Sequence, residues 1–318
     1  MIEQFEHRSV MLHEVLDCLA PKPGEIFVDC TLGGAGHSVE VAKHLGTGGV
    51  LIGIDQDATA RKFATQRLMD LDDAIRPEIN VMAANFSELD SVLTEVCVPG
   101  IDAILFDLGV SSVQLDVLER GFSYHEGAPL DMRMNPDSDG ITAEDIVNEW
   151  EQAQIERILR VYGEEKFSRQ IAANIVDARA EARISTSDEL VEIVKASIPA
   201  AKRRTGGHPA KRTFQALRIA VNDELSCLET ALESAIRWLN PGGRICVISY
   251  HSLEDKRVKN AFRELENRCT CGPDVPVCVC GKKPILKSVP RGAVLPTKEE
   301  IETNPRARSA KLRCAHKL

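Results

Sequence analysis

Short apolar runs bounded by Gly, Pro, Asp or Asn recur along this sequence, and their recurrence constrains the fold more than any other feature. Five of these runs have the composition of strands that are buried on both faces, and they cover residues 26–29, 50–54, 79–83, 103–106 and 244–248. Segments of helical length separate the first four runs, for example residues 38–45 and 58–71. Alternating strands and helices predict an α/β fold with a parallel sheet.

The alternation stops after Asp107, and the segment that follows has helical patterns. Residues 142–198 carry two capping-box sequences and apolar residues at helical spacing. We expect one long helix at residues 213–239, which ends at the Asn-Pro-Gly-Gly sequence before the fifth strand. The expected architecture is therefore one discontinuous sheet domain, interrupted by an all-helical insert: residues 1–111 and 210–318 form the first, and residues 112–209 form the second.

Composition excludes several classes of protein. Of the 318 residues, 43% are hydrophobic and 27% are charged, values that exclude intrinsic disorder and fibrous repeats. The sequence has no apolar run of the roughly 18 residues that a membrane span requires, and its first residues lack the order of a signal peptide. Most of the ten cysteines are scattered singly, which is typical of a reducing compartment. We therefore expect a soluble cytoplasmic protein with no membrane partner.

A glycine-rich turn, Gly33-Gly34-Ala35-Gly36, follows the first strand and leads into a helix. Such a turn lets a ligand approach the backbone at the carboxyl edge of a parallel sheet, although it can also be purely structural. It differs from a dinucleotide fingerprint, because Val39 stands where the third glycine belongs. The sequence also has no Gly-Lys-Ser/Thr phosphate loop.

Polar and aromatic residues follow the next strand ends. Asp55 ends the second strand, where two adjacent carboxylate oxygens suit a ribose diol. Asn85 and Phe86 follow the third strand and are suited to flank an adenine, and Asp107 ends the fourth strand. This succession predicts an adenosyl ligand laid across the sheet edge.

Unusual motifs span nearly the whole chain in a fixed order. They include His7-Arg-Ser-Val-Met-Leu-His-Glu14, Phe106-Asp-Leu-Gly-Val-Ser-Ser-Val-Gln114, Gly127-Ala-Pro-Leu-Asp-Met-Arg-Met134, His208-Pro-Ala-Lys-Arg-Thr-Phe-Gln-Ala-Leu-Arg218 and Ser249-Tyr-His-Ser-Leu-Glu-Asp255. With them the chain resembles the ribosomal RNA small-subunit methyltransferase H family. The resemblance implies a class I, Rossmann-like sheet, S-adenosylmethionine as cofactor, and methylation of N4 of a cytidine in bacterial 16S ribosomal RNA. The implied partner is 16S ribosomal RNA or the small ribosomal subunit.

The resemblance also implies which residues contact S-adenosylmethionine: Ala35, Gly36, His37, Asp55, Phe86, Asp107 and Gln114. Two positions depart from the common family pattern. Ala35 stands where relatives often have Gly, and Tyr250 stands where they frequently have Phe. Since Ala35 adds only a methyl group, we expect its backbone contact to persist.

Two residues are candidates for the chemistry. An exocyclic amine is a poor nucleophile, so acceptors must hold its N–H groups in the transition state. We expect Asp107 to lie near both the methionine and the target amine, although a strand-end Asp can merely cap the next turn. His251 can accept a proton or contact the base, or else belong to a turn in which Ser252 caps the next helix.

Four clustered cysteines, Cys269, Cys271, Cys278 and Cys280, leave their role open. Four thiolates suit structural zinc, but one intervening residue in each pair is fewer than usual for a zinc site. Reduced cysteines in a stiff loop, or a redox role, are the alternatives. The family resemblance does not require a metal, and we assign none.

The net charge is −9, yet residues 201–218 contain six basic residues and no acidic ones. Guanidinium groups beside flexible glycines suit phosphate contacts. We expect Arg203, Arg204, Lys211 and Arg212 to bind the RNA, so that the insert acts as an RNA-binding jaw. A solvated basic loop is the alternative, and the basic segment at residues 282–318 is the next candidate.

Two other functions compete with methyl transfer. A nicotinamide-dependent dehydrogenase shares the glycine-rich turn and the Asp55 carboxylate, but it does not explain the Asp107 motif or the basic segments. A non-enzymatic, RNA-binding ribosome-assembly factor explains the basic segments, but the intact cofactor positions argue against it.

Overall fold

The computed structural model describes residues 9–111, 114, 117–124, 127–203, 207–267, 271, 277 and 280–318. The chain divides into two compact units. Met1–Gly109 and Leu225–Leu318 form the first, here called the sheet unit, and Val110–Glu224 form the second, here called the helical unit.

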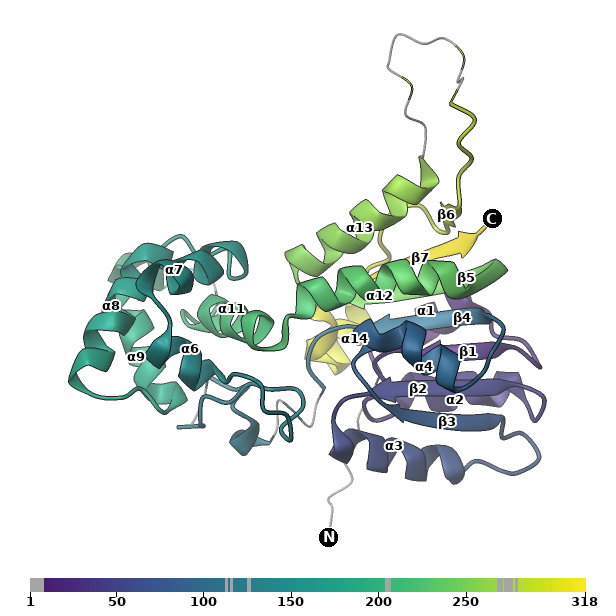
Figure 1. The fold of residues 1–318 in the computed structure, drawn as a ribbon, viewed down its shortest axis with the longest axis horizontal. Helices are drawn as coiled ribbons and strands as arrows, with labels where there is room; N and C mark the ends of the chain where they lie inside the picture. Colours follow the sequence, from purple (N-terminus) through teal and green to yellow (C-terminus); the bar gives the residue numbers. More distant parts are fainter. Residues whose placement is uncertain are drawn as a thin grey trace. The chain divides into compact units, whose positions relative to one another are not determined.

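The described residues of the sheet unit form a seven-stranded sheet in the order β3-β2-β1-β4-β5-β7-β6 (Figure 1). The parallel strands are β1 (Ile26–Asp29), β2 (Val50–Asp55), β3 (Glu78–Ala83), β4 (Ile101–Asp107) and β5 (Leu239–Ser249). The expected parallel α/β sheet is therefore confirmed. Two further strands, β6 (Leu286–Ser288) and β7 (Lys311–Lys317), pair antiparallel beyond β5, and the sequence analysis did not predict them.

Helices cover both faces of the sheet because successive strand residues point to opposite sides. Phe27, Leu51 and Leu105 share one hydrophobic cluster with α1 (Leu12–Leu19), α2 (Gly36–Leu45) and α3 (Ala58–Met69). Val28, Ile52 and Ile104 share the opposite cluster with α4 (Leu89–Glu95), α12 (Glu224–Trp238) and α13 (Ser252–Glu266). Burial on both faces explains why these strands read as continuous apolar runs.

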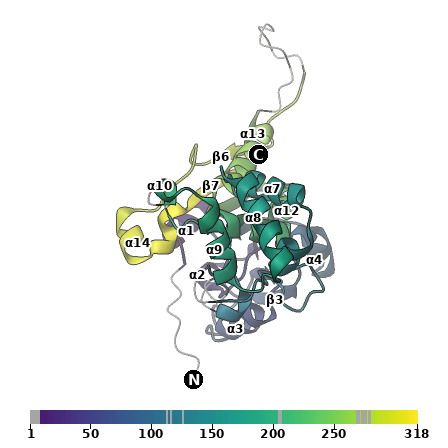
Figure 2. The same cartoon turned by 90° about the vertical axis from the view of Figure 1, so that its left-hand side faces the viewer.

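The helix α1 is fixed by residues that are distant in sequence. Arg244 of β5 donates hydrogen bonds to the carbonyls of Leu19 and Ala20 at the end of α1. Near its start, the Met11 N–H donates to Glu300 Oε1 at 2.6 Å. Glu300 belongs to α14 (Lys298–Thr303), which lies beside α1 in Figure 2 and is followed by the 3₁₀ helix η3 (Pro305–Ser309). These bonds hold α1 over β5 and β7.

The helical unit contains α6 (Ala143–Glu149), α7 (Gln152–Val161), α8 (Ser168–Glu181), α9 (Ser187–Ser197), α10 (Ala200–Arg203) and α11 (Lys211–Asn222), preceded by the 3₁₀ helix η2 (Leu118–Arg120). Both predicted capping boxes are present, at Thr142 and Thr186. The apolar residues predicted at helical spacing, such as Ile155, Ile171 and Leu190, are buried in one cluster. No helix among the described residues is long and apolar enough to cross a membrane.

The prediction of one long helix at residues 213–239 is wrong. The helix breaks at Asp223, which has a left-handed φ of 46°, so that α11 ends at Asn222 and α12 begins at Glu224. Asn222 ties the end of α11 to a loop, since its side chain accepts from Met134 N–H and donates to the Met132 carbonyl. The helical unit accordingly extends to Glu224, further than the insert expected from the sequence.

Candidate active site at the carboxyl edge of the sheet

The carboxyl ends of the parallel strands bring the predicted residues of the sheet unit to one edge. The turn after β1 bonds to both neighbouring strands, because Cys30 N–H donates to the Leu105 carbonyl and Leu32 N–H donates to the Ile54 carbonyl. Gly53 allows this close packing: a Cβ at position 53 would lie 2.7 Å from the Leu32 side chain. The glycine-rich turn therefore lies between Asp55 and Asp107.

The glycine-rich turn has the backbone conformation that glycine favours. Gly33 has a φ of 47°, and Ala35, the N-cap of α2, has a φ of 56°. A left-handed conformation costs an L-residue about 1 kcal/mol or more, so a glycine at position 35 would adopt it with less strain. Ala35 is fully buried, and its methyl group is accommodated in the core cluster beneath the turn.

Asp55 supports the turn and retains capacity to accept more hydrogen bonds. Its Oδ2 accepts from Gly33 N–H at 2.8 Å, and its Oδ1 accepts from Asp57 N–H at 2.8 Å. A carboxylate has about four lone-pair sites, so each oxygen can still accept one hydrogen bond. Burial raises the pKa of Asp55 to about 6, against the lowering effect of the two backbone donors. Additional donors at this carboxylate would favour its charged form.

Asp29 is a buried carboxylate that supports the site. In the sequence, only its position at the end of the first strand indicates that it lies at this edge. It is 2% exposed, and its oxygens accept from Ser38 Oγ at 2.6 Å and from Thr31 N–H at 3.0 Å. The Thr31 hydroxyl in turn accepts from the Asp107 N–H at 2.6 Å. Burial raises the pKa of Asp29, whereas the Ser38 bond lowers it. The hydroxyls at positions 31 and 38 were a sequence signal that the prediction did not use.

Asp107 lies between a tyrosine and a histidine. Its Oδ1 accepts from the Tyr250 hydroxyl at 2.7 Å, and its Oδ2 lies 3.7 Å from His37 Nδ1. His37 donates from Nε2 to the Val10 carbonyl at 3.0 Å, which fixes the orientation of its ring. The Asp107 side chain is 22% exposed. Burial raises its pKa, and His37 and Tyr250 oppose that rise.

Tyr250 is a functional candidate that the sequence analysis missed. The family resemblance marks it only as a position that frequently has Phe, but its hydroxyl supplies a hydrogen bond that Phe cannot make. Its ring also packs against Gly109, where a Cβ would lie 3.3 Å from the ring. The Tyr250 side chain therefore holds the segment after β4 as well as the Asp107 carboxylate.

His251 is the N-cap of α13, so the expected cap at Ser252 is displaced by one residue. Its Nδ1 accepts from Glu254 N–H at 3.4 Å, while Glu254 Oε2 accepts from the N–H groups of Tyr250 and His251 at 2.8 and 3.1 Å. The His251 Nε2 is buried and has no aligned hydrogen-bond partner among the described residues, although Glu254 Oε1 lies 3.1 Å away. This capping box fixes the backbone from which Tyr250 projects.

Phe86 is positioned by a local cap and by packing. Asn85 forms a capping box with Glu88 at the 3₁₀ helix η1 (Phe86–Glu88), which follows β3. The Phe86 ring meets Phe106 edge to face, with ring centroids 6.1 Å apart. The site edge thus contains an aromatic face next to the polar residues of β2.

Comparison with known proteins shows the family to which this chain belongs. The model of the MraW methylase family matches residues 4–318. A relative from Paenibacillus sp. (strain JDR-2), named ribosomal RNA small subunit methyltransferase H, is 55% identical over 320 residues, covering 99% of this chain and 100% of the relative. The chain belongs to the MraW methylase family. It is an S-adenosylmethionine-dependent methyltransferase.

Two further proteins are similar to this methylase. A relative of the same name from Brevibacillus brevis is 51% identical over 314 residues, covering 99% of this chain and 98% of the relative. The crystal structure of an rRNA methylase from Streptococcus thermophilus is 13% identical with a TM-score of 0.42, covering 100% of this chain and 99% of that chain.

The carboxyl edge fits the cofactor of this methylase. The two spare acceptor positions on Asp55 match the two hydroxyls of a ribose. The Gly33-Gly34-Ala35 turn itself carries no side chain larger than a methyl group, and Phe63 and Arg67 of α3 lie against Gly34. When bound, S-adenosylmethionine supplies an electrophilic methyl group, so that the protein mainly has to align the acceptor. The Asp107 side chain at the same edge is 22% exposed.

The remaining predicted residues of the methylase belong to the helical unit. Gln114 is buried, and its Oε1 accepts from Ser111 N–H at 2.9 Å. Arg203 ends α10, and Lys211 and Arg212 begin α11; all three are exposed, and Arg212 donates to the Glu164 carbonyl at 2.8 Å. Arg204 lies outside the described residues.

The predicted cysteine cluster falls partly outside the described chain. Cys269 and Cys278 are not among the described residues, whereas Cys271 and Cys280 are described and half-buried. The zinc, stiff-loop and redox alternatives for this cluster therefore stay predictions.

Proposed function

We propose that this methylase transfers a methyl group from S-adenosylmethionine to N4 of a cytidine in 16S ribosomal RNA of the small subunit. The observation that carries the proposal is the Asp107 carboxylate, held by the Tyr250 hydroxyl at the same sheet edge as the Asp55 carboxylate. One carboxylate suits the donor and the other suits an amine acceptor. Relatives that are 55% and 51% identical, over 100% and 98% of their length, bear the name ribosomal RNA small subunit methyltransferase H.

Methyl transfer to RNA is tested directly with 16S ribosomal RNA from a strain that lacks this methylase. We expect the purified protein and radiolabelled S-adenosylmethionine to modify one cytidine, which nuclease mapping and mass spectrometry identify as N4-methylated. A dehydrogenase or a non-enzymatic assembly factor would leave the RNA unlabelled. Label on a base other than cytosine would refute the proposed substrate.

In the proposed site, Asp55 binds the ribose. Its carboxylate accepts two hydroxyl hydrogen bonds at the lone pairs that the backbone of Gly33 and Asp57 leaves unused. Only the ionised form accepts at both oxygens, so binding requires a pH above the pKa of about 6 in the free protein. As pH falls through this value, Asp55 takes up a proton and one acceptor is lost.

We predict that Asp55→Ala weakens S-adenosylmethionine binding by about 2 kcal/mol, roughly a 30-fold rise in Kd, because a hydrogen bond to a charged group is lost. Isothermal titration calorimetry measures this. Wild-type affinity should fall below about pH 6, whereas the affinity of Asp55→Ala should not follow this titration. The exposed residue Asp73 provides the control Asp73→Ala. Wild-type affinity in folded Asp55→Ala protein would contradict the assignment.

Asp107 is proposed to accept an N–H of the target amine as it becomes pyramidal. The carboxylate must be ionised for this task, yet burial raises its pKa. The Tyr250 hydroxyl opposes that rise and restrains one carboxylate oxygen at 2.7 Å. His251 was predicted to be catalytic as well; its described contacts support a role in positioning Tyr250 through the cap of α13.

We predict that Tyr250→Phe moves the acid limb of the kcat/KM profile for RNA to higher pH by about one unit, when the profile is measured at saturating S-adenosylmethionine so that titration of Asp55 does not set the limb. A hydrogen bond to a charged group contributes about 1.5 kcal/mol, and about 1.4 kcal/mol corresponds to one pKa unit. Removing the donor raises the pKa of Asp107, so the ionised form appears only at higher pH. The control Tyr162→Phe removes a hydroxyl from the helical unit and should leave the limb unchanged. An unshifted limb in Tyr250→Phe would show that Asp107 does not govern the rate.

The exposed basic residues at the end of α10 and the start of α11 are proposed to hold the RNA backbone. A target base must be unstacked before it enters an enclosed site, and backbone clamping provides the energy for that step. Arg203, Lys211 and Arg212 are exposed, so their charges are available to phosphates. In this proposal the helical unit is the RNA-binding jaw.

We predict that the triple variant Arg203→Ala, Lys211→Ala, Arg212→Ala binds S-adenosylmethionine normally but binds RNA less tightly. Each lost single-strand phosphate contact should reduce the slope of log K against log salt by about 0.7. Fluorescence anisotropy at several salt concentrations measures the slope. The control variant Lys22→Ala, Lys43→Ala, Lys62→Ala removes the same charge from exposed positions of the sheet unit, outside both basic segments. Equal slopes of log K against log salt in the two variants would contradict the assignment of the helical unit as the RNA-binding jaw.

A further inference from the structure

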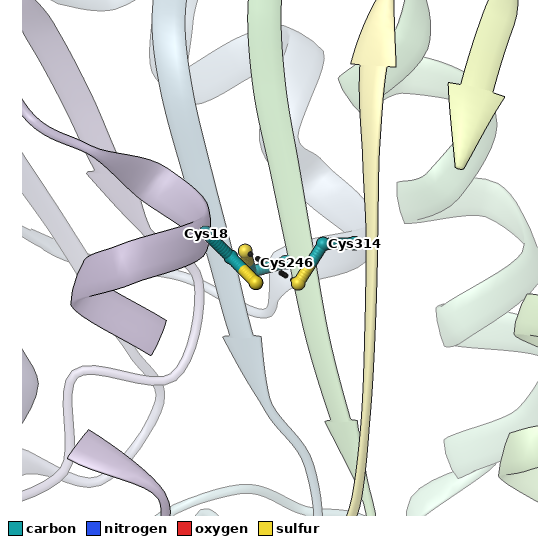
Figure 3. Close-up of side chains that lie close together, drawn as sticks. All are labelled: Cys18, Cys246 and Cys314. Atoms are coloured by element: carbon teal, nitrogen blue, oxygen red, sulfur yellow. Dashed lines mark hydrogen bonds between the residues drawn. The ribbon is translucent and has the colours of Figure 1, made fainter. Parts of the chain in front are cut away.

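Three cysteines that are far apart in the sequence converge under α1. Cys18 of α1, Cys246 of β5 and Cys314 of β7 place their Sγ atoms within 4.8 Å of one another (Figure 3). Cys246 and Cys314 are buried in the sheet core, at 0% and 1% exposure, and Cys18 is half-buried. All three are free thiols. Neither the glycine-rich turn nor the proposed RNA-binding residues involve this cluster.

The register of the two strands places Cys246 directly opposite Cys314. The Cys314 carbonyl accepts from Val289 N–H on the other side of β7, and its neighbour on the same face, Leu312, exchanges both backbone hydrogen bonds with Val294 on that side. The backbone groups of Cys314 therefore point away from β5, so Cys246 and Cys314 form a non-hydrogen-bonded pair of the ladder. In such pairs the Cα atoms lie only about 4.5 Å apart.

This separation is compatible with a disulfide, which needs Cα atoms about 4.4 to 6.8 Å apart. The two Sγ atoms already lie 3.2 Å apart and face each other, as the dashed line in Figure 3 shows. Bond formation thus requires rotation and approach of the sulfurs, without a change of strand register.

The surroundings favour a disulfide over a metal ion. Burial raises the pKa of Cys246, so a site that needs several thiolates there is costly. A closed structural zinc site uses four ligands, whereas this group of described residues supplies three sulfurs. A disulfide is neutral and carries no such electrostatic cost.

Cys18 differs from the other two thiols in access and in charge. It is the member of the cluster with partial exposure. Hydrogen bonds from the Cys246 and Cys314 thiols lower the pKa of Cys18, and nearby His316 acts in the same direction. Thiolate character and access together determine which thiol reacts first with a disulfide.

We propose that Cys18, Cys246 and Cys314 form a thiol–disulfide exchange site, in which Cys18 reacts with a low-molecular-weight disulfide and the stable product is a Cys246–Cys314 disulfide. The Cys18 thiolate attacks R–S–S–R, forms a mixed disulfide and expels RS⁻. Cys314 then attacks the Cys18 sulfur and expels the second RS⁻, and Cys246 attacks the Cys314 sulfur and releases Cys18. Two electrons pass from the Cys246 and Cys314 sulfurs to R–S–S–R, and their two protons yield two R–SH molecules.

The Cys246–Cys314 disulfide would link β5 to β7, the strand through which the C-terminal segment joins the sheet. The bond closes a loop between residues separated by 68 positions. This loop includes α13, α14 and the antiparallel strand β6. Oxidation therefore restrains a large part of the sheet unit without touching the carboxylates of the proposed methyl-transfer site, and the inference does not depend on that function.

The experiment treats the folded, full-length chain with oxidised glutathione, blocks remaining thiols with iodoacetamide, digests with trypsin and follows peptides by mass spectrometry. Cleavage after Arg244, Lys256, Arg313 and Lys317 isolates the two cysteines, so the product is residues 245–256 joined to residues 314–317. We expect this pair to accumulate in the wild type and to disappear with dithiothreitol. Cys18→Ser and Cys18→Ala should slow its formation about tenfold or more, because the remaining thiols are buried. Cys97→Ser, which removes an exposed thiol elsewhere, should not slow it.

Several outcomes would overturn the proposal. If the joined peptide does not form in the folded wild type, the geometry does not support exchange. Formation at the wild-type rate in both Cys18 variants would refute the role of Cys18. If the purified wild type holds about one equivalent of copper or zinc that is lost in Cys18→Ser and in Cys314→Ser, the cluster is a metal site and the exchange proposal is wrong.

Discussion

The buried carboxylate of Asp29 is the interaction on which the candidate site depends. It accepts hydrogen bonds from the Ser38 hydroxyl in the first turns of α2 and from the Thr31 N–H in the loop that precedes them. The Thr31 hydroxyl accepts from the Asp107 N–H, so that the position of Asp107 also depends on this loop. A buried carboxylate that lost these donors would incur a large desolvation cost. The loop is thereby held in one conformation, and Gly33 N–H is presented to Asp55. The two candidate carboxylates, Asp55 and Asp107, are thus positioned through a third carboxylate that is buried.

Much of this arrangement follows from local sequence. Strands buried on both faces read as continuous apolar runs, and the residue that ends each run must lie at the sheet edge, so Asp55 and Asp107 were predictable. The break between α11 and α12 was not, because the apolar stripe continues through it. That break depends on the left-handed Asp223 and on the bonds of Asn222 to Met132 and Met134, contacts that span about ninety positions.

Contacts made across the sheet were the least predictable. The identity of residue 250 alone does not tell whether its hydroxyl meets a partner; the pairing with Asp107 needs β4 and β5 to be neighbours. The same holds for the cysteines, which are scattered singly in the sequence and converge only because β7 pairs with β5 and α1 packs over both. Periodicity reveals which face a residue occupies, but pairing between distant strands reveals what it touches.

The charges at the sheet edge also determine which form of the cofactor this edge favours. Asp29 raises the pKa of Asp55 and Asp107 in addition to the effect of burial, so this edge disfavours a further negative charge and favours a positive one. A sulfonium donor is a cation, and the thioether that remains after methyl transfer is neutral. Under the proposed function, the carboxylates therefore attract the donor more strongly than the spent product. The desolvation that raises their pKa is thus also a reason for the edge to prefer the substrate form of the cofactor.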